Sequence, residues 1–169
     1  ILRNDSSKFL NSTTLFTNFS YIKSEVDVSK LNYVEARPLQ GQSPIIINAG
    51  LQYLDSKYDF GISVSYNYVG KRIVIVGNSD EPSIWENPRH ILDLQLSKTF
   101  KSKFEVKLNL RDALAQNLIY YQDVNKNGKF DKSSLTDNKE FTHANTSDNV
   151  MVNTKLAPTI SLSLSYKFN

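Results

Sequence analysis

The sequence predicts an all-β protein, and three observations support this fold class. Apolar and small polar residues alternate with a period of two, which sends them to opposite faces of a strand. Serine, threonine, tyrosine and branched residues are plentiful in these segments, as strands prefer. No segment carries a convincing helical stripe of apolar residues. The clearest example is the stretch "TISLSLSYKFN", in which every second residue from Ile160 to Phe168 is apolar or aromatic.

Six strands are expected along the chain. The segment "TTLFTNFSYIKSEV" follows the pattern loosely, "PIIINAGLQYL" also fits, and "FGISVSYNYVG", "ILDLQLSKTF" and "FEVKLNLRD" alternate clearly. The expected strands lie near residues 13–27, 44–54, 59–74, 90–100, 103–121 and 158–168.

The links between these strands alternate between short and long. Only "DSKY" separates the second strand from the third, and only "KS" separates the fourth from the fifth, whereas residues 28–43, 75–89 and 122–157 form long links. Outer-membrane barrels have tight periplasmic turns and longer extracellular loops, while a soluble sandwich mixes long and short loops at both ends. The alternation favours a membrane barrel, and a soluble β-barrel or sandwich is the alternative.

The composition of the two strand faces favours the same architecture. The face opposite the apolar one is rich in serine, asparagine, glutamine and threonine and carries few charges, which suits a wet lumen on one side and lipid on the other. Aromatic residues gather near strand ends, where an interfacial girdle is expected. These residues are Tyr53, Phe60, Phe100, Phe104, Tyr120, Tyr121, Tyr166 and Phe168.

Composition also excludes several classes of function. The 169 residues include no cysteine and only two histidines, which excludes disulfides and thiolate sites and leaves little for zinc. The 20 basic and 17 acidic residues are interspersed, so no basic stripe for nucleic acid is present. The mean hydropathy of −0.39 and the lack of a long apolar run exclude a transmembrane helix. No nucleophile–base pair or metal spacing is found, so an enzyme is the weakest interpretation and no cofactor is expected.

Several motifs together resemble a known family. They are "ARPLQGQSPIIINAGLQY", "YNYVGKRI", "ENPRHILDLQLSKTF", "LNLRDALAQNLIYYQDVNKNGKFD" and the closing "SLSLSYKF". In this order they resemble the C-terminal barrel strands of TonB-dependent outer-membrane receptors, in the branch that often carries a carboxypeptidase-regulatory-like domain before the plug. Such barrels commonly finish on an aromatic residue read by the assembly machinery. Tyr166 and Phe168 match that feature, although here Asn169 follows Phe168.

The resemblance implies a barrel of about 22 strands with a plugged lumen. Six strands cannot close such a barrel, so residues 1–169 are expected to be the C-terminal part of one barrel domain. The start "ILRNDSSKFL" has no features of a signal peptide. The family's signal peptide, TonB box, plug and earlier strands are expected upstream. The C-terminus is then periplasmic, and residues 28–43, 75–89 and 122–157 are extracellular.

The implied function is import of a scarce solute, bound at the cell surface, when periplasmic TonB pulls on the plug. The implied partners are outer-membrane lipid, the plug and earlier strands of the same chain, and TonB acting through upstream residues. Two alternatives stay open. One is a barrel scaffold that holds surface lipoproteins in an outer-membrane complex, and the other is a soluble β-barrel module that binds a small ligand.

Candidate site residues fall into two groups. Asp93, Arg111 and Asp112 resemble an acid/base cluster, but within alternating strands they are better explained as charges that face the lumen or the plug. The lumen-facing candidates are Asp93, Gln95, Asn109 and Arg111. The ligand-side loop candidates are Arg37, Gln40, Gln42, Trp85 and Arg89. For the two arginines we favour a structural bond to the carbonyl of a neighbouring loop over a ligand contact, and for Trp85 we favour packing in a girdle or loop over stacking on a ligand.

The stretch "DVNKNGKFDKSS" begins like an EF-hand calcium loop. Asp123, Asn125 and Asn127 occupy positions one, three and five, and Asp131 occupies position nine. Position twelve, which needs a bidentate acidic residue, is Ser134. We therefore expect no metal here and predict that Asn127-Gly128 makes a hairpin turn inside a surface loop.

Overall fold

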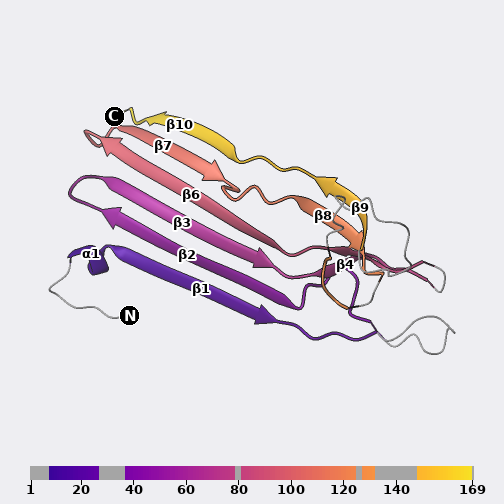
Figure 1. Ribbon diagram of the computed structural model, residues 1–169. Helices are drawn as coiled ribbons and strands as arrows, with labels where there is room; N and C mark the ends of the chain where they lie inside the picture. The colour runs from indigo at the N-terminus through magenta and orange to yellow at the C-terminus, as the bar shows by residue number, and fades with distance from the viewer. Residues whose placement is uncertain (1–7, 27–36, 79–80, 125–126, 132–147, 169) are drawn as a thin grey trace.

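The computed structural model describes residues 8–26, 37–78, 81–124, 127–131 and 148–168, and in these ranges the protein is all-β (Figure 1). Every strand pairing is antiparallel. One turn of helix, α1 (Lys8–Asn11), precedes the first strand. Among the described residues, no helix is long and apolar enough to cross a membrane.

The main element is a six-stranded sheet with the order β1-β2-β3-β6-β7-β10. Each of the six predicted strands contributes to it. The strands are β1 (Thr13–Tyr21), β2 (Ile45–Asp55), β3 (Phe60–Val69), β6 (Arg89–Phe100), β7 (Phe104–Arg111) and β10 (Thr159–Tyr166). The sheet is open, with β1 and β10 at its two edges (Figure 1).

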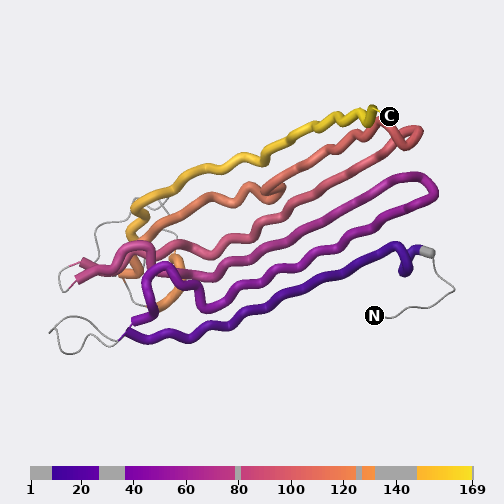
Figure 2. Tube along the Cα trace, turned by 180° about the vertical axis from the view of Figure 1, so that it is seen from behind, coloured from indigo at the N-terminus to yellow at the C-terminus, as the bar shows by residue number. Residues whose placement is uncertain are grey.

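A second sheet of four strands has the order β4-β5-β8-β9 and was not predicted. Its strands are β4 (Arg72–Ile75), β5 (Ile84–Glu86), β8 (Leu118–Gln122) and β9 (Asn149–Thr154). Each of them lies in the direction of one strand of the main sheet, β3, β6, β7 or β10, and is separated from it by a short break, as the trace in Figure 2 shows. The expected strands 59–74 and 103–121 are therefore each two strands, and the expected loops 75–89 and 122–157 contain β5 and β9.

The breaks between the sheets have local causes. Pro88 precedes β6 and Pro158 precedes β10, and proline has no backbone N–H to donate to a ladder. Gly70 separates β3 from β4. Between β7 and β8 the chain turns through Asp112 and Ala115, whose φ angles of 50° and 45° are incompatible with a strand.

The two predicted short links are tight turns at one end of the main sheet. In the β6–β7 turn the backbone N–H of Lys103 donates to the carbonyl of Phe100 at 3.1 Å. Lys101 and Ser102 both have positive φ, 49° and 56°, as a type I′ turn requires. The helix α1 and the end of β10 both lie at this end in the two views (Figures 1 and 2).

The register places most of the apolar residues of all six strands on one face. Along one row of paired positions Leu15 faces Leu51, which faces Val64, and the row continues through Leu94 and Leu110 to Ile160. The neighbouring residues form the polar face, where Ser63, Gln95 and Asn109 lie in a second row. The predicted alternation of two faces is confirmed across the whole sheet.

The apolar face of the main sheet is uncovered. Twelve large side chains on it are exposed, and Leu15 and Leu164 have 70% and 60% of their surface accessible. Among the described residues, the fully buried apolar side chains are Ile73 and Tyr121, both in the four-stranded sheet. The twelve are Leu15, Phe19, Tyr21, Leu51, Leu96, Phe100, Phe104, Leu108, Ile160, Leu162, Leu164 and Tyr166.

One large ring lies on the polar face because a glycine makes room for it. Phe16 in β1 pairs directly with Gly50 in β2. A Cβ atom at position 50 would overlap the ring of Phe16. The ring therefore covers the glycine backbone, an arrangement that compensates for the missing side chain in a strand.

We expect Gly50→Ala and Phe16→Ala to be non-additive by about 1 kcal/mol in the free energy of urea unfolding. With Phe16 present, the new methyl group displaces the ring. In the Phe16→Ala background the same substitution is expected to stabilise the strand by about 0.5–1 kcal/mol, because alanine has less backbone freedom to lose than glycine. Additive effects of the two substitutions would contradict the packing of Phe16 on Gly50.

Candidate functional site

The polar face of the main sheet carries a hollow of about 260 Å³. All four lumen-facing candidates line it: Asp93 and Gln95 from β6, and Asn109 and Arg111 from β7. Three serines from β3 and β10 complete its polar lining, Ser63, Ser65 and Ser161. The amide of Asn109 donates to the hydroxyl of Ser161 at 3.3 Å. The structure thus brings the four predicted residues together with hydroxyl and amide groups from neighbouring strands.

An ion pair borders the polar face where β6 begins and β7 ends. The guanidinium of Arg89 lies 3.2 Å from the carboxylate of Asp112. The backbone N–H of Asp112 donates to the carboxylate of Asp93 at 2.8 Å, which holds the turn after β7 against β6. Arg89 Nε and Asp112 Oδ1 are buried without a hydrogen-bond partner. Arg89 therefore binds the end of a neighbouring strand. Its partner is the carboxylate of Asp112, whereas a loop carbonyl was expected.

The other four ligand-side candidates are scattered. Three of them line two different hollows, and the fourth lines neither. Gln42 and Trp85 line a mostly apolar hollow of about 240 Å³ together with Tyr21, Pro38 and Pro44. Gln40 lines another, of about 410 Å³, and its amide donates to the carbonyl of Val74 at 2.7 Å.

Arg37 lines neither of these hollows. Its guanidinium donates to the carbonyl of Pro38, the next residue in the chain, at 3.2 Å, whereas the expected structural bond was to the carbonyl of a neighbouring loop. Its backbone pairs with Val26 in an isolated bridge. The five candidates therefore do not form one site.

Trp85 packs against a lysine that sequence reasoning did not select. The Nζ atom of Lys71 lies 4.2 Å from the centre of the Trp85 ring, close enough for a cation–π contact. The same ammonium donates to the carbonyl of Gly128 at 2.8 Å and lies 3.9 Å from the carboxylate of Asp123. Burial lowers the pKa of Lys71, and the charges of Asp123 and Asp148 oppose that shift. Lys71 links the tryptophan to the loop that follows β8, in agreement with loop packing.

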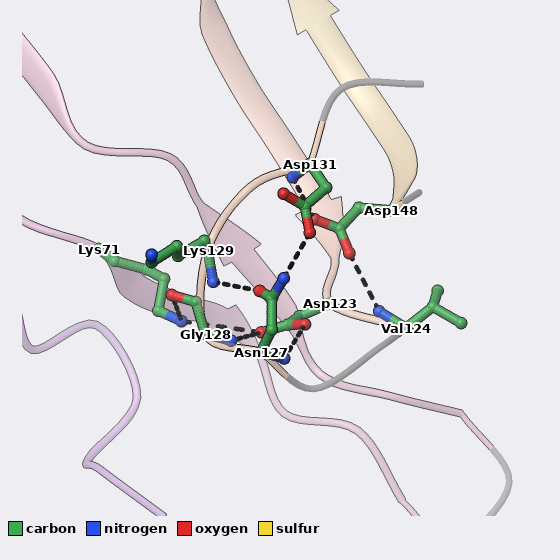
Figure 3. A network of polar contacts seen from close by, with 8 residues as sticks. All are labelled: Lys71, Asp123, Val124, Asn127, Gly128, Lys129, Asp131 and Asp148. Carbon is green, nitrogen blue, oxygen red and sulfur yellow. Dashed lines mark hydrogen bonds and ion pairs between the residues drawn. The ribbon is translucent and has the colours of Figure 1, made fainter. Parts of the chain in front are cut away.

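The loop that begins like a calcium site is organised by carboxylates that accept backbone N–H groups (Figure 3). Asp123 accepts the N–H of Asn127 at 3.1 Å and that of Gly128 at 2.8 Å. Asp148 accepts the N–H of Val124 at 3.2 Å and that of Asp131 at 2.7 Å. Both carboxylates are buried, with 9% and 4% of the residue exposed. They replace the backbone partners that this loop lacks.

This geometry agrees with a turn. Gly128 has a φ of 78°, and residues 125–126, which would form one side of the predicted hairpin, lie outside the described residues, so the hairpin stays a prediction. Asn125 lies outside the described residues. Within the described ranges, no group of three or more histidine, cysteine or acidic side chains is placed to hold a metal ion.

Tyr121 and Asp148 are structurally important, and sequence reasoning missed both in these roles. Tyr121 was expected in an interfacial girdle, but it is fully buried, with its ring 4.9 Å from that of Phe130. Its hydroxyl has no hydrogen-bond partner. Burial raises the pKa of Tyr121, and the charges of Asp123, Asp148 and Asp131 raise it further. Neither role has a sequence signal, because 25 residues separate Asp148 from Asp123.

No protein-family model, curated protein or solved structure matches this chain.

We expect Tyr121→Phe to leave the free energy of unfolding unchanged or to raise it near pH 7, because it removes a buried hydroxyl without a partner. Because the folded-state pKa of Tyr121 is raised, its contribution to stability is complete below the ordinary value of 10.0 and is lost as the pH rises above it. The free energy of unfolding of wild type, measured with urea, should therefore fall relative to that of Tyr121→Phe above pH 10. A difference independent of pH would contradict the assignment.

We expect Asp148→Ala to destabilise the loop that follows β8, because two backbone N–H groups lose their acceptor. The expected cost is about 1–3 kcal/mol. Hydrogen exchange at the amides of Val124 and Asp131 should accelerate, whereas exchange in β2 and β3 should stay unchanged. Asp148→Asn keeps one acceptor oxygen and is the matched control, with a smaller effect. Unchanged exchange at both loop amides in Asp148→Ala would contradict the role of the carboxylate.

Proposed function

We propose that this chain forms part of the wall of an outer-membrane β-barrel of the TonB-dependent receptor type. The barrel would bind a scarce solute at the cell surface and import it into the periplasm. The uncovered apolar face of the six-stranded sheet is the observation that carries the proposal. Full burial stabilises a large apolar side chain by about 1.5–3 kcal/mol. For twelve exposed side chains the gain still available is on the order of 10–20 kcal/mol, as large as the whole stability of a typical domain.

Strand length and strand edges favour lipid as the cover of this face. β2, β3 and β6 have 11, 10 and 12 residues, close to the 9–11 residues with which a tilted strand crosses a bilayer. In a bilayer every backbone polar group needs an internal partner, so the open edges of β1 and β10 require further strands. A larger barrel, to which this chain contributes six strands, would supply them.

The opposite face suits a wet lumen. Its hollow is lined by carboxylate, guanidinium, amide and hydroxyl groups from β3, β6, β7 and β10. Such groups can hydrogen-bond to a plug domain or to a polar solute that passes along the wall. The tight turns would then face the periplasm, and the four-stranded sheet and its loops would project from the cell.

Two other functions, a soluble ligand-binding module and a scaffold for surface lipoproteins, are each disfavoured by a different observation. A soluble ligand-binding module would need a cover over the apolar face, and in the described residues nothing covers it. A scaffold for surface lipoproteins would share the same lipid-facing wall, and import is preferred over it because of the polar hollow on the inner face. Neither function needs a catalytic group in this chain.

The facing of β10 can be tested by a pair of arginine substitutions. Leu164 belongs to the apolar face and Ser163 to the polar face of the same exposed strand. We expect Leu164→Arg to cost about 2–4 kcal/mol if residue 164 lies near the bilayer midplane. Ser163→Arg is expected to be nearly silent, because its side chain would point into water.

The measurement is the free energy of unfolding of the protein in lipid vesicles, together with the amount of folded protein in the outer membrane. Ser163→Arg serves as the matched control, because it adds the same side chain one residue away. Equal losses from the two substitutions would reject the assigned facing and with it the lipid-facing wall.

A further inference from the structure

Lysines gather at the turn end of the main sheet, beside β6, β7 and β10. Lys98 lies in β6, Lys101 and Lys103 lie in the β6–β7 turn, and Lys167 follows β10. The backbone N–H of Lys167 donates to the carbonyl of Lys103 at 2.9 Å, which holds the segment after β10 against this turn. These four lysines therefore lie at one corner of the sheet, which we call the lysine corner. The ends of β6, β7 and β10 meet at this corner in Figure 1.

Three of the four lysines form no ion pair within the described residues. Lys101, Lys103 and Lys167 are exposed and take part in none of the ion pairs of the described residues. The nearby Glu105 pairs with Lys107 at 3.1 Å. Lys98 donates to the carbonyl of Tyr58 and lies 5.7 Å from the centre of the Phe100 ring, so its role is partly structural.

Exposed aromatic rings lie directly beside these lysines on the apolar face. Phe104 pairs with Phe100 on one side and with Tyr166 on the other, so three neighbouring strands carry a ring at the same level. Phe168 packs edge-on against Tyr166 with ring centres 4.9 Å apart, and 86% of it is exposed. Aromatic rings prefer the boundary between the acyl chains and the headgroups of a bilayer. The rings thus place the lysine corner at the depth of lipid phosphates.

At the other end of the described protein, a lysine lies among carboxylates. Lys71 there pairs with Asp123, and Asp131 and Asp148 lie in the same loop network. Within the described residues, the lysine corner is therefore the better match for a leaflet that carries anionic phospholipids.

We propose that the lysine corner binds the headgroups of anionic phospholipids, with phosphate groups lying between Lys101, Lys103 and Lys167. This inference rests on the proposed lipid-facing wall and adds to it the lipid class of one leaflet. Lysine attracts an anionic membrane surface over about one Debye length, and each lysine near the surface contributes separately. The surrounding rings anchor the neighbouring acyl chains.

The test compares two triple variants that remove the same charge. One is Lys101→Gln/Lys103→Gln/Lys167→Gln, and the control is Lys23→Gln/Lys129→Gln/Lys155→Gln, which changes exposed lysines away from the turn end. The full protein is reconstituted in vesicles of phosphatidylcholine and phosphatidylglycerol and then extracted. Native mass spectrometry counts the lipids of each class that remain bound.

We expect the wild type and the control variant to retain phosphatidylglycerol in excess over its share in the vesicles. The variant of the lysine corner should lose about fivefold or more of that enrichment, and 0.5 M salt should weaken it in the wild type. Equal enrichment in both triple variants would overturn the inference.

A probe separates this failure from failure of the lipid-facing wall. The chain has no cysteine, so Leu164→Cys and Ser163→Cys each accept one environment-sensitive fluorophore. If the fluorophore reports apolar surroundings at position 164 alone and phosphatidylglycerol is not enriched, the headgroup site is rejected and the lipid-facing wall is retained. If it reports aqueous surroundings at both positions, the wall and the headgroup site are both rejected.

Discussion

The structure depends on the register of five antiparallel ladders in the main sheet. In each ladder an apolar residue pairs with an apolar or aromatic residue, as in the row from Leu15 to Ile160. A slip of one residue in any ladder would move a whole strand's apolar set to the polar face. The two faces, the polar hollow and the row of rings at the turn end all require that this register is kept.

The two ends of the protein are stabilised in different ways. The turn end consists of short links whose geometry follows from local backbone conformation, such as the positive φ of Lys101 and Ser102. The loop end has a small core with two buried apolar side chains, Ile73 and Tyr121, and carboxylates hold the loop that follows β8. The main sheet between these ends has backbone ladders, and among the described residues nothing covers its apolar face.

Much of the fold could be predicted because it follows from alternation. A period of two identifies a strand and its two faces without any knowledge of neighbours, and the positions of all six main strands follow from it. The same argument placed Asp93, Gln95, Asn109 and Arg111 on one face, and the structure brings them to one hollow. The strands β5 and β9 escaped prediction because they are short and because both pair with β8, which is distant from each of them in the chain.

Side-chain partners across long links could not be predicted. Asp148 accepts N–H groups from Val124 and Asp131, and Arg89 pairs with Asp112, although nothing in the local sequence marks these pairs. Trp85 and Arg89 are four residues apart in the chain, yet they belong to different sites because Pro88 separates β5 from β6. Such contacts depend on where the second sheet places each loop.

The sequence by itself determined the all-β class, the strands of the main sheet, their apolar and polar faces and the tight turns. These features depend on interactions between residues close in the chain and on a periodicity of two. Only the tertiary structure decided the second sheet, the burial of Tyr121, the linkage of Lys71 to Trp85 and Asp123, and the corner where Lys167 meets Lys103. Those depend on contacts between distant segments, whose positions are set by the packing of the strands.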